Sequence, residues 1–79
     1  MRYVSVRVVD SGGRPKRDSR VAIEVHQFLA GGIVGKQTNS DGMAQFRLNV
    51  DEGAEITIMV DGNVRVQRGS IRADYSVTG

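Results

Sequence analysis

Three glycines and a lysine follow an apolar run in FLAGGIVGKQ, residues 28 to 37, a composition that phosphate-binding loops share. A Walker loop needs Gly-x-x-x-x-Gly-Lys-Ser/Thr. Counting back from Gly35 and Lys36 puts Ala30 at the first glycine and Gln37 at the hydroxyl position. The dinucleotide fingerprint Gly-x-Gly-x-x-Gly keeps two of its three glycines. Both motifs work at the start of a helix, whereas a polar segment, a turn and a strand-like pattern follow here, so we expect a connection between strands.

Residues for nucleophilic catalysis and for metal binding are scarce. A nucleophilic triad needs Ser or Thr beside a base, and the single histidine, His26, is expected on the outward face of a strand. The acidic residues in or beside predicted turns are Asp41, Asp51, Glu52, Glu55 and Asp61. Asp favours turns for backbone reasons, and these residues lack the spacing of an EF-hand. Because cysteine is also absent, we expect no enzyme, no cofactor, no disulfide and no metal site.

The segment RPKRDSR, residues 14 to 20, is the sharpest candidate for binding. Its cations are Arg14, Lys16, Arg17 and Arg20. Residues 1 to 20 hold six basic and two acidic side chains, whereas the remainder of the chain has a net charge of −2. Four cations on a loop that Pro15 rigidifies suit phosphate groups or an acidic protein surface. The simpler interpretation is a solvated loop that keeps the protein soluble.

Two further observations bear on this basic loop, residues 14–20. Three more arginines near the last predicted hairpin would extend the surface if the fold brings the two regions together: Arg65, Arg68 and Arg72. Binders of single-stranded nucleic acid also use exposed aromatic side chains. The chain has only two Tyr and two Phe, and we expect Phe46 and Tyr75 to lie in the core.

Apolar and polar residues alternate over most of the chain, which is the period of half-buried strands. The predicted strands span 3–10, 20–30, about 33–38, 43–50, 55–60, 64–68 and 70–77. Turn signals separate them. NSDG at 39–42 predicts a hairpin between the strands 33–38 and 43–50, and Asp61-Gly62 is a second hairpin signal. The expected inward side chains are Val4, Val6, Val8, Val21, Ile23, Val25, Leu29, Ala44, Phe46, Leu48, Val50, Ile56, Ile58, Val60, Val64, Val66, Ile71, Ala73, Tyr75 and Val77. Six or seven short strands without a helix predict an all-β, antiparallel sandwich, with a small β-barrel as the alternative.

The length of 79 residues predicts a single domain over 1–79, which buries about 60–65% of the surface of its unfolded chain and leaves little room for a deep active site. No apolar run approaches the roughly 18 residues that cross a bilayer, and the alternating first residues do not form a signal peptide. We therefore expect no membrane partner and, if the chain is whole, a cytoplasmic location.

The runs VRVVDSGGRP, VAIEV, TNSDGMAQFRL and GAEITIMVDG carry a resemblance. They resemble the bacterial Ig-like and carboxypeptidase-regulatory (transthyretin-like) β-sandwich modules over about residues 4 to 62. The positions that fit are Asp10, Gly13, Pro15, Thr38, Asp41, Gly42, Ala44, Phe46 and Leu48. Asn39 departs from the pattern, and EITIMV lacks its usual aromatic residue. The resemblance implies a non-catalytic module that supports, spaces or docks partners.

Two functional hypotheses follow. The first is a structural or protein-interaction module that docks another protein, a larger assembly or a second copy through an exposed strand edge or through the loop GGIVG, with Gly32, Ile33 and Val34 as contacts. The second is a small domain that binds a polyanion or nucleic acid through Arg14, Lys16, Arg17 and Arg20.

Overall fold

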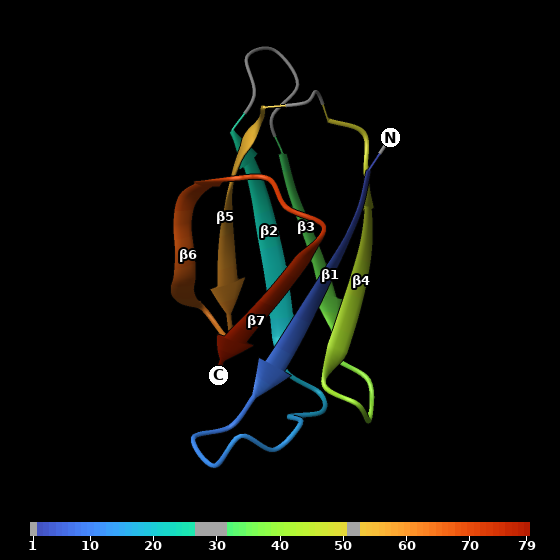
Figure 1. Ribbon diagram of the computed structural model, residues 1–79, viewed down its shortest axis with the longest axis vertical. Helices are drawn as coiled ribbons and strands as arrows, with labels where there is room; N and C mark the ends of the chain where they lie inside the picture. Colours follow the sequence, from blue (N-terminus) through green and yellow to red (C-terminus); the bar gives the residue numbers. More distant parts are fainter. Residues whose placement is uncertain (1, 27–31, 51–52) are drawn as a thin grey trace.

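A computed structural model describes residues 2–26, 32–50 and 53–79 as seven β-strands in two sheets (Figure 1). The strands are β1 (Arg2–Val9), β2 (Arg20–His26), β3 (Gly32–Gln37), β4 (Met43–Leu48), β5 (Glu55–Val60), β6 (Asn63–Ser70) and β7 (Asp74–Thr78). The described residues include no helix, and so none that is long and apolar enough to cross a membrane. The predicted all-β class and the seven strands are confirmed.

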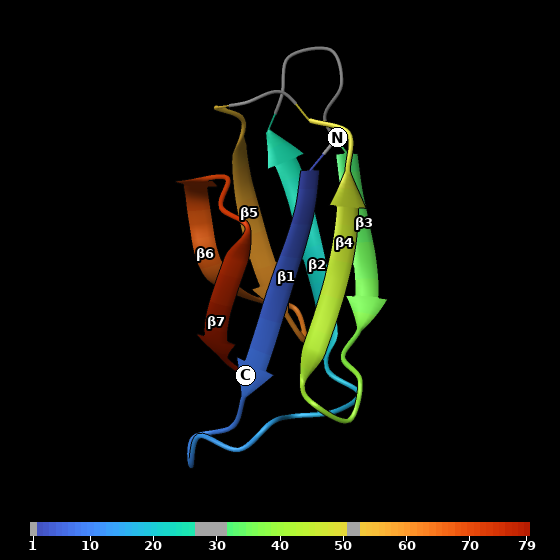
Figure 2. The ribbon, with the colours of Figure 1, turned by 45° about the vertical axis from the view of Figure 1, so that its right-hand side comes forward.

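The two sheets have the strand orders β4-β1-β7 and β3-β2-β5-β6 and stack as two layers (Figure 2). Every pair of strands is antiparallel except β1 with β7, where Val6 lies opposite Tyr75 in a parallel ladder. The expected antiparallel arrangement is therefore wrong for this pair. The reason is the connection after β6, which crosses from one sheet to the other and returns the chain in the direction of β1.

The turn signals form as predicted, with one correction. Asp61 and Gly62 both have positive φ (51° and 86°) and connect β5 to β6 as a two-residue hairpin. The Oδ1 atom of Asn39 accepts the N–H groups of Asp41 and Met43 at 2.9 and 3.1 Å, so NSDG is also a turn. However, its flanking strands β3 and β4 belong to different sheets, so the expected hairpin there is wrong. After the turn, the chain pairs with β1 instead.

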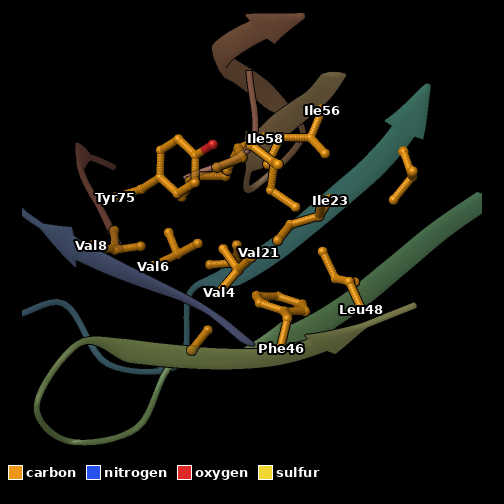
Figure 3. Close-up of a cluster of buried hydrophobic side chains, with 14 residues drawn as sticks. Val4, Val6, Val8, Val21, Ile23, Phe46, Leu48, Ile56, Ile58 and Tyr75 are labelled. Atoms are coloured by element: carbon orange, nitrogen blue, oxygen red, sulfur yellow. The ribbon is translucent and has the colours of Figure 1, made fainter. Parts of the chain in front are cut away.

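The core lies between the two sheets and is built from the inward residues of both (Figure 3). Its buried apolar side chains are Val4, Val6, Val8, Val21, Ile23, Val25, Ala44, Phe46, Leu48, Ile56, Ile58, Val60, Ile71 and Tyr75. Val50, Val66 and Val77 pack against its margin. These positions confirm the period-two prediction; Leu29 lies outside the described residues.

Two predicted core positions are wrong. Val64 is 51% exposed because the two-residue turn pairs Val60 with Asn63 and so places Val64 opposite the outward-facing Met59. The register shift beyond this pair then places Val66 opposite the buried Ile58. A shift of one residue moves a side chain to the other face of a sheet. Ala73 is exposed because it lies before the first residue of β7 and not in the strand. Its carbonyl accepts the N–H of Ser5 at 2.8 Å.

Candidate functional site

β3 is one of the two edge strands of the four-stranded sheet, and among the described strands it pairs only with β2. All six of its residues are exposed, and they include two large apolar side chains, Ile33 at 66% and Val34 at 41%. The glycines Gly32 and Gly35 thus lie in a strand, consistent with the rejection of a phosphate loop. The predicted contact residues Gly32, Ile33 and Val34 lie together on a sheet edge and not on a loop.

The hydrogen bonds beside β3 show which of its backbone groups face solvent. The N–H of Thr38 donates to the carbonyl of Ser19 at 2.9 Å, directly beyond the ladder between β2 and β3. Successive residues of a strand direct their N–H and C=O groups to opposite sides. Gly32, Val34 and Lys36 therefore bond β2. Ile33, Gly35 and Gln37 direct their backbone groups away from the sheet, where no described strand pairs with them.

The outer face beside this edge is hollowed. Ala22 on β2 lies opposite Gly35 on β3, and the small size of both residues leaves a shallow depression. Its lining is formed by Arg20, Ala22, Ile33, Gly35, Lys36 and Gln37. Across the sheet, the same row continues through Met59 on β5 to Val64 on β6. The row is apolar from edge to edge.

The other three sheet edges carry features that discourage further pairing. β6 has two register shifts and a non-glycine residue at positive φ, Arg68. The exposed residues of β4 include Arg47, and β7 is five residues long and begins at Asp74. Irregularity, charge and short length protect edge strands. Among the described strands, β3 has a regular edge whose outer face, formed by Ile33, Gly35 and Gln37, is uncharged. Its one charged side chain, Lys36, lies opposite Val21 on the core-facing side.

The basic loop lies at the end of the sandwich where β1 ends and β2 begins (Figure 1). Lys16 Nζ lies 3.5 Å from Asp61 Oδ2, and Arg17 Nε lies 3.4 Å from Asp18 Oδ2. The backbone N–H of Arg20 donates to Asp61 Oδ1 at 3.0 Å. This hydrogen bond, followed by the charge of Lys16, lowers the pKa of Asp61 despite some desolvation. Acidic neighbours thus offset part of the loop's positive charge.

The structure does not gather the other arginines around this loop. Arg68 Nη2 pairs with Glu55 Oε1 at 3.2 Å, and the guanidinium of Arg72 lies 5.1 Å from the ring centroid of Tyr75. Both lie at the opposite end of the sandwich, where β6 ends and β7 begins. Only Arg65 lies near the β5–β6 turn. The condition for an extended basic surface is therefore not met.

One pair was missed by sequence reasoning. His26 Nε2 lies 2.7 Å from Thr57 Oγ1, and its Nδ1 lies 3.8 Å from Glu24 Oε1. The order hydroxyl, imidazole, carboxylate is that of a nucleophilic triad. However, Thr57 is buried, and its Oγ1 accepts the backbone N–H of Arg68 at 3.2 Å, next to the register shift of the ladder. The contact between His26 and Thr57 therefore supports the irregular pairing of β5 with β6.

No protein-family model and no curated protein matches this chain. The geometry of the described residues is therefore the basis for a function. Among those residues, no group of three or more His, Asp or Glu side chains is arranged to hold a metal ion.

The alternation in the sequence could indicate only that His26 and Thr57 lie on the outer faces of two strands. Their contact depends on the pairing of β2 with β5, which periodicity does not reveal.

Proposed function

We propose that this protein is a non-catalytic interaction module that docks a protein partner through the edge of β3. The observation that carries the proposal is the regular, exposed edge of residues 32–37, in which the three residues with outward backbone groups, Ile33, Gly35 and Gln37, are uncharged. An extended segment that pairs with this edge would satisfy the backbone groups of Ile33, Gly35 and Gln37. Such strand addition obtains affinity from main-chain hydrogen bonds and specificity from alternate side chains.

The apolar side chains at this edge support the same function. Ile33 projects beside the depression over Ala22 and Gly35, while Val34 lies on the core-facing side, where a second depression separates β3 from Leu48 and Val50. A partner strand would cover both side chains. Burying apolar surface stabilises a complex by roughly 25 cal/mol per Å² before the costs of association.

The turn geometry supports membership in the Ig-like or transthyretin-like modules as a finer part of the proposal. Asp10 Oδ1 accepts the N–H groups of Gly12 and Arg14 at 2.9 and 3.0 Å, and Gly13 has a φ of 82°. Gly42, the glycine of the second motif, has a φ of 73°. Both resemblance motifs thus form ordered turns at the same end of a β-sandwich, as such a module requires.

Site-specific photo-crosslinking in cells tests the docking surface. A photoreactive side chain at Ile33 should give defined protein adducts, whereas one at Tyr3, which is 70% exposed on the other sheet, should not. Gly35→Pro should abolish the adducts, because it removes an N–H that faces away from β2 and leaves the internal ladder intact. Equal adducts from both positions, or adducts that survive Gly35→Pro in a folded variant, would refute docking at β3.

An NMR titration separates this function from polyanion binding. Amide NMR shifts upon addition of heparin or mixed-sequence DNA should be weak and should vanish near physiological ionic strength. Saturable shifts centred on residues 14–20 that persist at that salt concentration, together with no crosslinks from position 33, would replace the proposal with the polyanion hypothesis.

A further inference from the structure

We infer that the partner at the β3 edge is a second copy of this chain, paired antiparallel to β3 about a two-fold axis at Gly35. This inference rests on the proposed function, since it names the partner of the same surface. The four-stranded sheets of the two copies would join into one continuous sheet. Closed two-fold dimers are the commonest form of protein self-association.

The backbone pattern of β3 is symmetric about Gly35. The residues whose N–H and C=O groups face away from β2 are Ile33, Gly35 and Gln37. In an antiparallel pair centred on Gly35, each Ile33 lies opposite Gln37 of the second copy, and the two glycines lie opposite each other. Every outward group then has a partner, and the three residue pairs exchange about six hydrogen bonds.

The side chains are compatible with this register. Gly35 places no side chain at the axis, where two copies approach most closely. Ile33 faces the uncharged amide of Gln37, and Lys36 faces Val34 and not a second lysine. Directly opposed like charges destabilise a sheet, and this register has none.

The charge of the edge also favours a second copy over a different partner. On the outer face of β3 the side chains of Ile33 and Gln37 are uncharged, so this face offers no charge with which to select an oppositely charged strand. The one charged residue of β3, Lys36, lies on the other face. The edge matches itself in hydrogen bonding and in apolar character. On the outer face, the row from Val64 through Met59 and Ala22 to Gly35 would continue into the same row of the second copy.

The contact consists of one short strand on each side, so the complex should be weak. Interfaces below about 1,200 Å² are typical of transient associations. We therefore expect a dimer that forms at concentrations of about 0.1–1 mM and dissociates on dilution to about 10 µM.

Sedimentation equilibrium of the purified chain over that concentration range tests the inference directly. The expected result is a reversible equilibrium between one and two copies, with the amide hydrogens of Ile33, Gly35 and Gln37 exchanging more slowly at high concentration. A chain that remains a single copy at about 1 mM would overturn the inference.

Charge exchange at the axis tests the register. Gly35→Lys and Gly35→Glu should each weaken dimerisation about threefold to tenfold, because like charges then oppose each other at the two-fold axis. An equimolar mixture of the two variants should associate more strongly than either alone. The matched control introduces the same residues at Gln45, an exposed position on β4, and should have little effect. Dimerisation unchanged by substitution at Gly35, or no recovery in the mixture, would refute this interface.

The outcomes distinguish this inference from the proposed function. Crosslinks from Ile33 to other proteins in cells, together with a purified chain that does not dimerise, would refute the second copy and retain docking at β3. The absence of both crosslinks and dimers would refute both. Crosslinks whose mass corresponds to two copies of the 8.6 kDa chain, lost in Gly35→Lys, would support both.

Discussion

The Oδ1 atom of Asp61 accepts the backbone N–H of Arg20 at 3.0 Å, which bonds the β5–β6 turn to the first residue of β2. In the reverse direction, the N–H of Asp61 donates to the carbonyl of Arg20 at 2.8 Å. Lys16 adds its charge at 3.5 Å from the same carboxylate. The aspartate of the hairpin signal therefore also anchors the basic loop, and part of the positive charge beside it is already neutralised.

This contact predicts an acid-dependent loss of stability. Since the pKa of Asp61 in the folded protein is lowered from its ordinary value of 3.8, the carboxylate stabilises the fold above that value, and this contribution disappears as the pH falls through the lowered pKa. Asp61→Asn, which tolerates positive φ, should flatten the fall in unfolding free energy between about pH 5 and pH 2. At pH 7 the loss should stay below about 1 kcal/mol, because the side chain is 43% exposed.

Urea unfolding at pH 7, 4 and 3 measures this effect. Asp41→Asn is the matched control, since Asp41 is an exposed residue of the separate NSDG turn. An acid response that is identical in wild type and Asp61→Asn would show that the contact with Arg20 and Lys16 adds nothing to stability.

Phe46 is the largest fully buried side chain of the core and packs between the sheets from β4 (Figure 3). Phe46→Ala should lower the free energy of unfolding by about 3–5 kcal/mol, because it removes buried apolar surface and leaves a cavity. Tyr3→Ala, on an exposed residue of β1, should change it by less than about 0.5 kcal/mol. Thermal or denaturant melts compare the two, and similar losses for both variants would contradict the assignment of inner and outer faces.

Gly42 lies at a position that a side chain cannot occupy. Its φ is +73°, and a Cβ atom there would lie 2.5 Å from the carbonyl oxygen of Val8 and 3.0 Å from the backbone nitrogen of Lys16. Gly42→Ala should cost about 2–4 kcal/mol through backbone strain and this overlap. Gly32→Ala, where a Cβ meets nothing within 4 Å, is the control and should be nearly neutral. Equal stability of the two variants in chemical denaturation would contradict the packing of the NSDG turn.

The hydroxyl of Thr57 should stabilise the folded protein through its two hydrogen bonds. Thr57→Val keeps the shape but leaves the N–H of Arg68 and the ring of His26 without their partner, so we expect a loss of about 1–2 kcal/mol. Thr57→Ser retains the oxygen and should lose less. Hydrogen exchange at the Arg68 amide should accelerate in the valine variant only. Unchanged exchange in that variant would show that Thr57 does not support the irregular ladder.

The period-two pattern predicted the strands and nearly the whole core, because burial on one face dictates alternation within each strand. It did not predict which strands pair. The register shift between β5 and β6 interrupts the regular alternation. The parallel pairing of β1 with β7 and the contact of His26 with Thr57 depend on neighbours distant in sequence. The sequence predicts Ile33 and Val34 as contact residues, but their place on a sheet edge depends on the pairing of β3 with β2 and on the lack of a second neighbour among the described strands.

The parallel pairing of β1 with β7 has a kinetic consequence. The three-stranded sheet joins the first strand of the described chain to the last, and its other ladder joins β1 to β4. Both contacts close long loops, and folds dominated by such pairings form slowly, on the scale of milliseconds to seconds. Before β7 pairs with β1, Val6 and Val8 lack their neighbours Tyr75 and Val77, so one side of these buried valines is open to a wrong partner during that time.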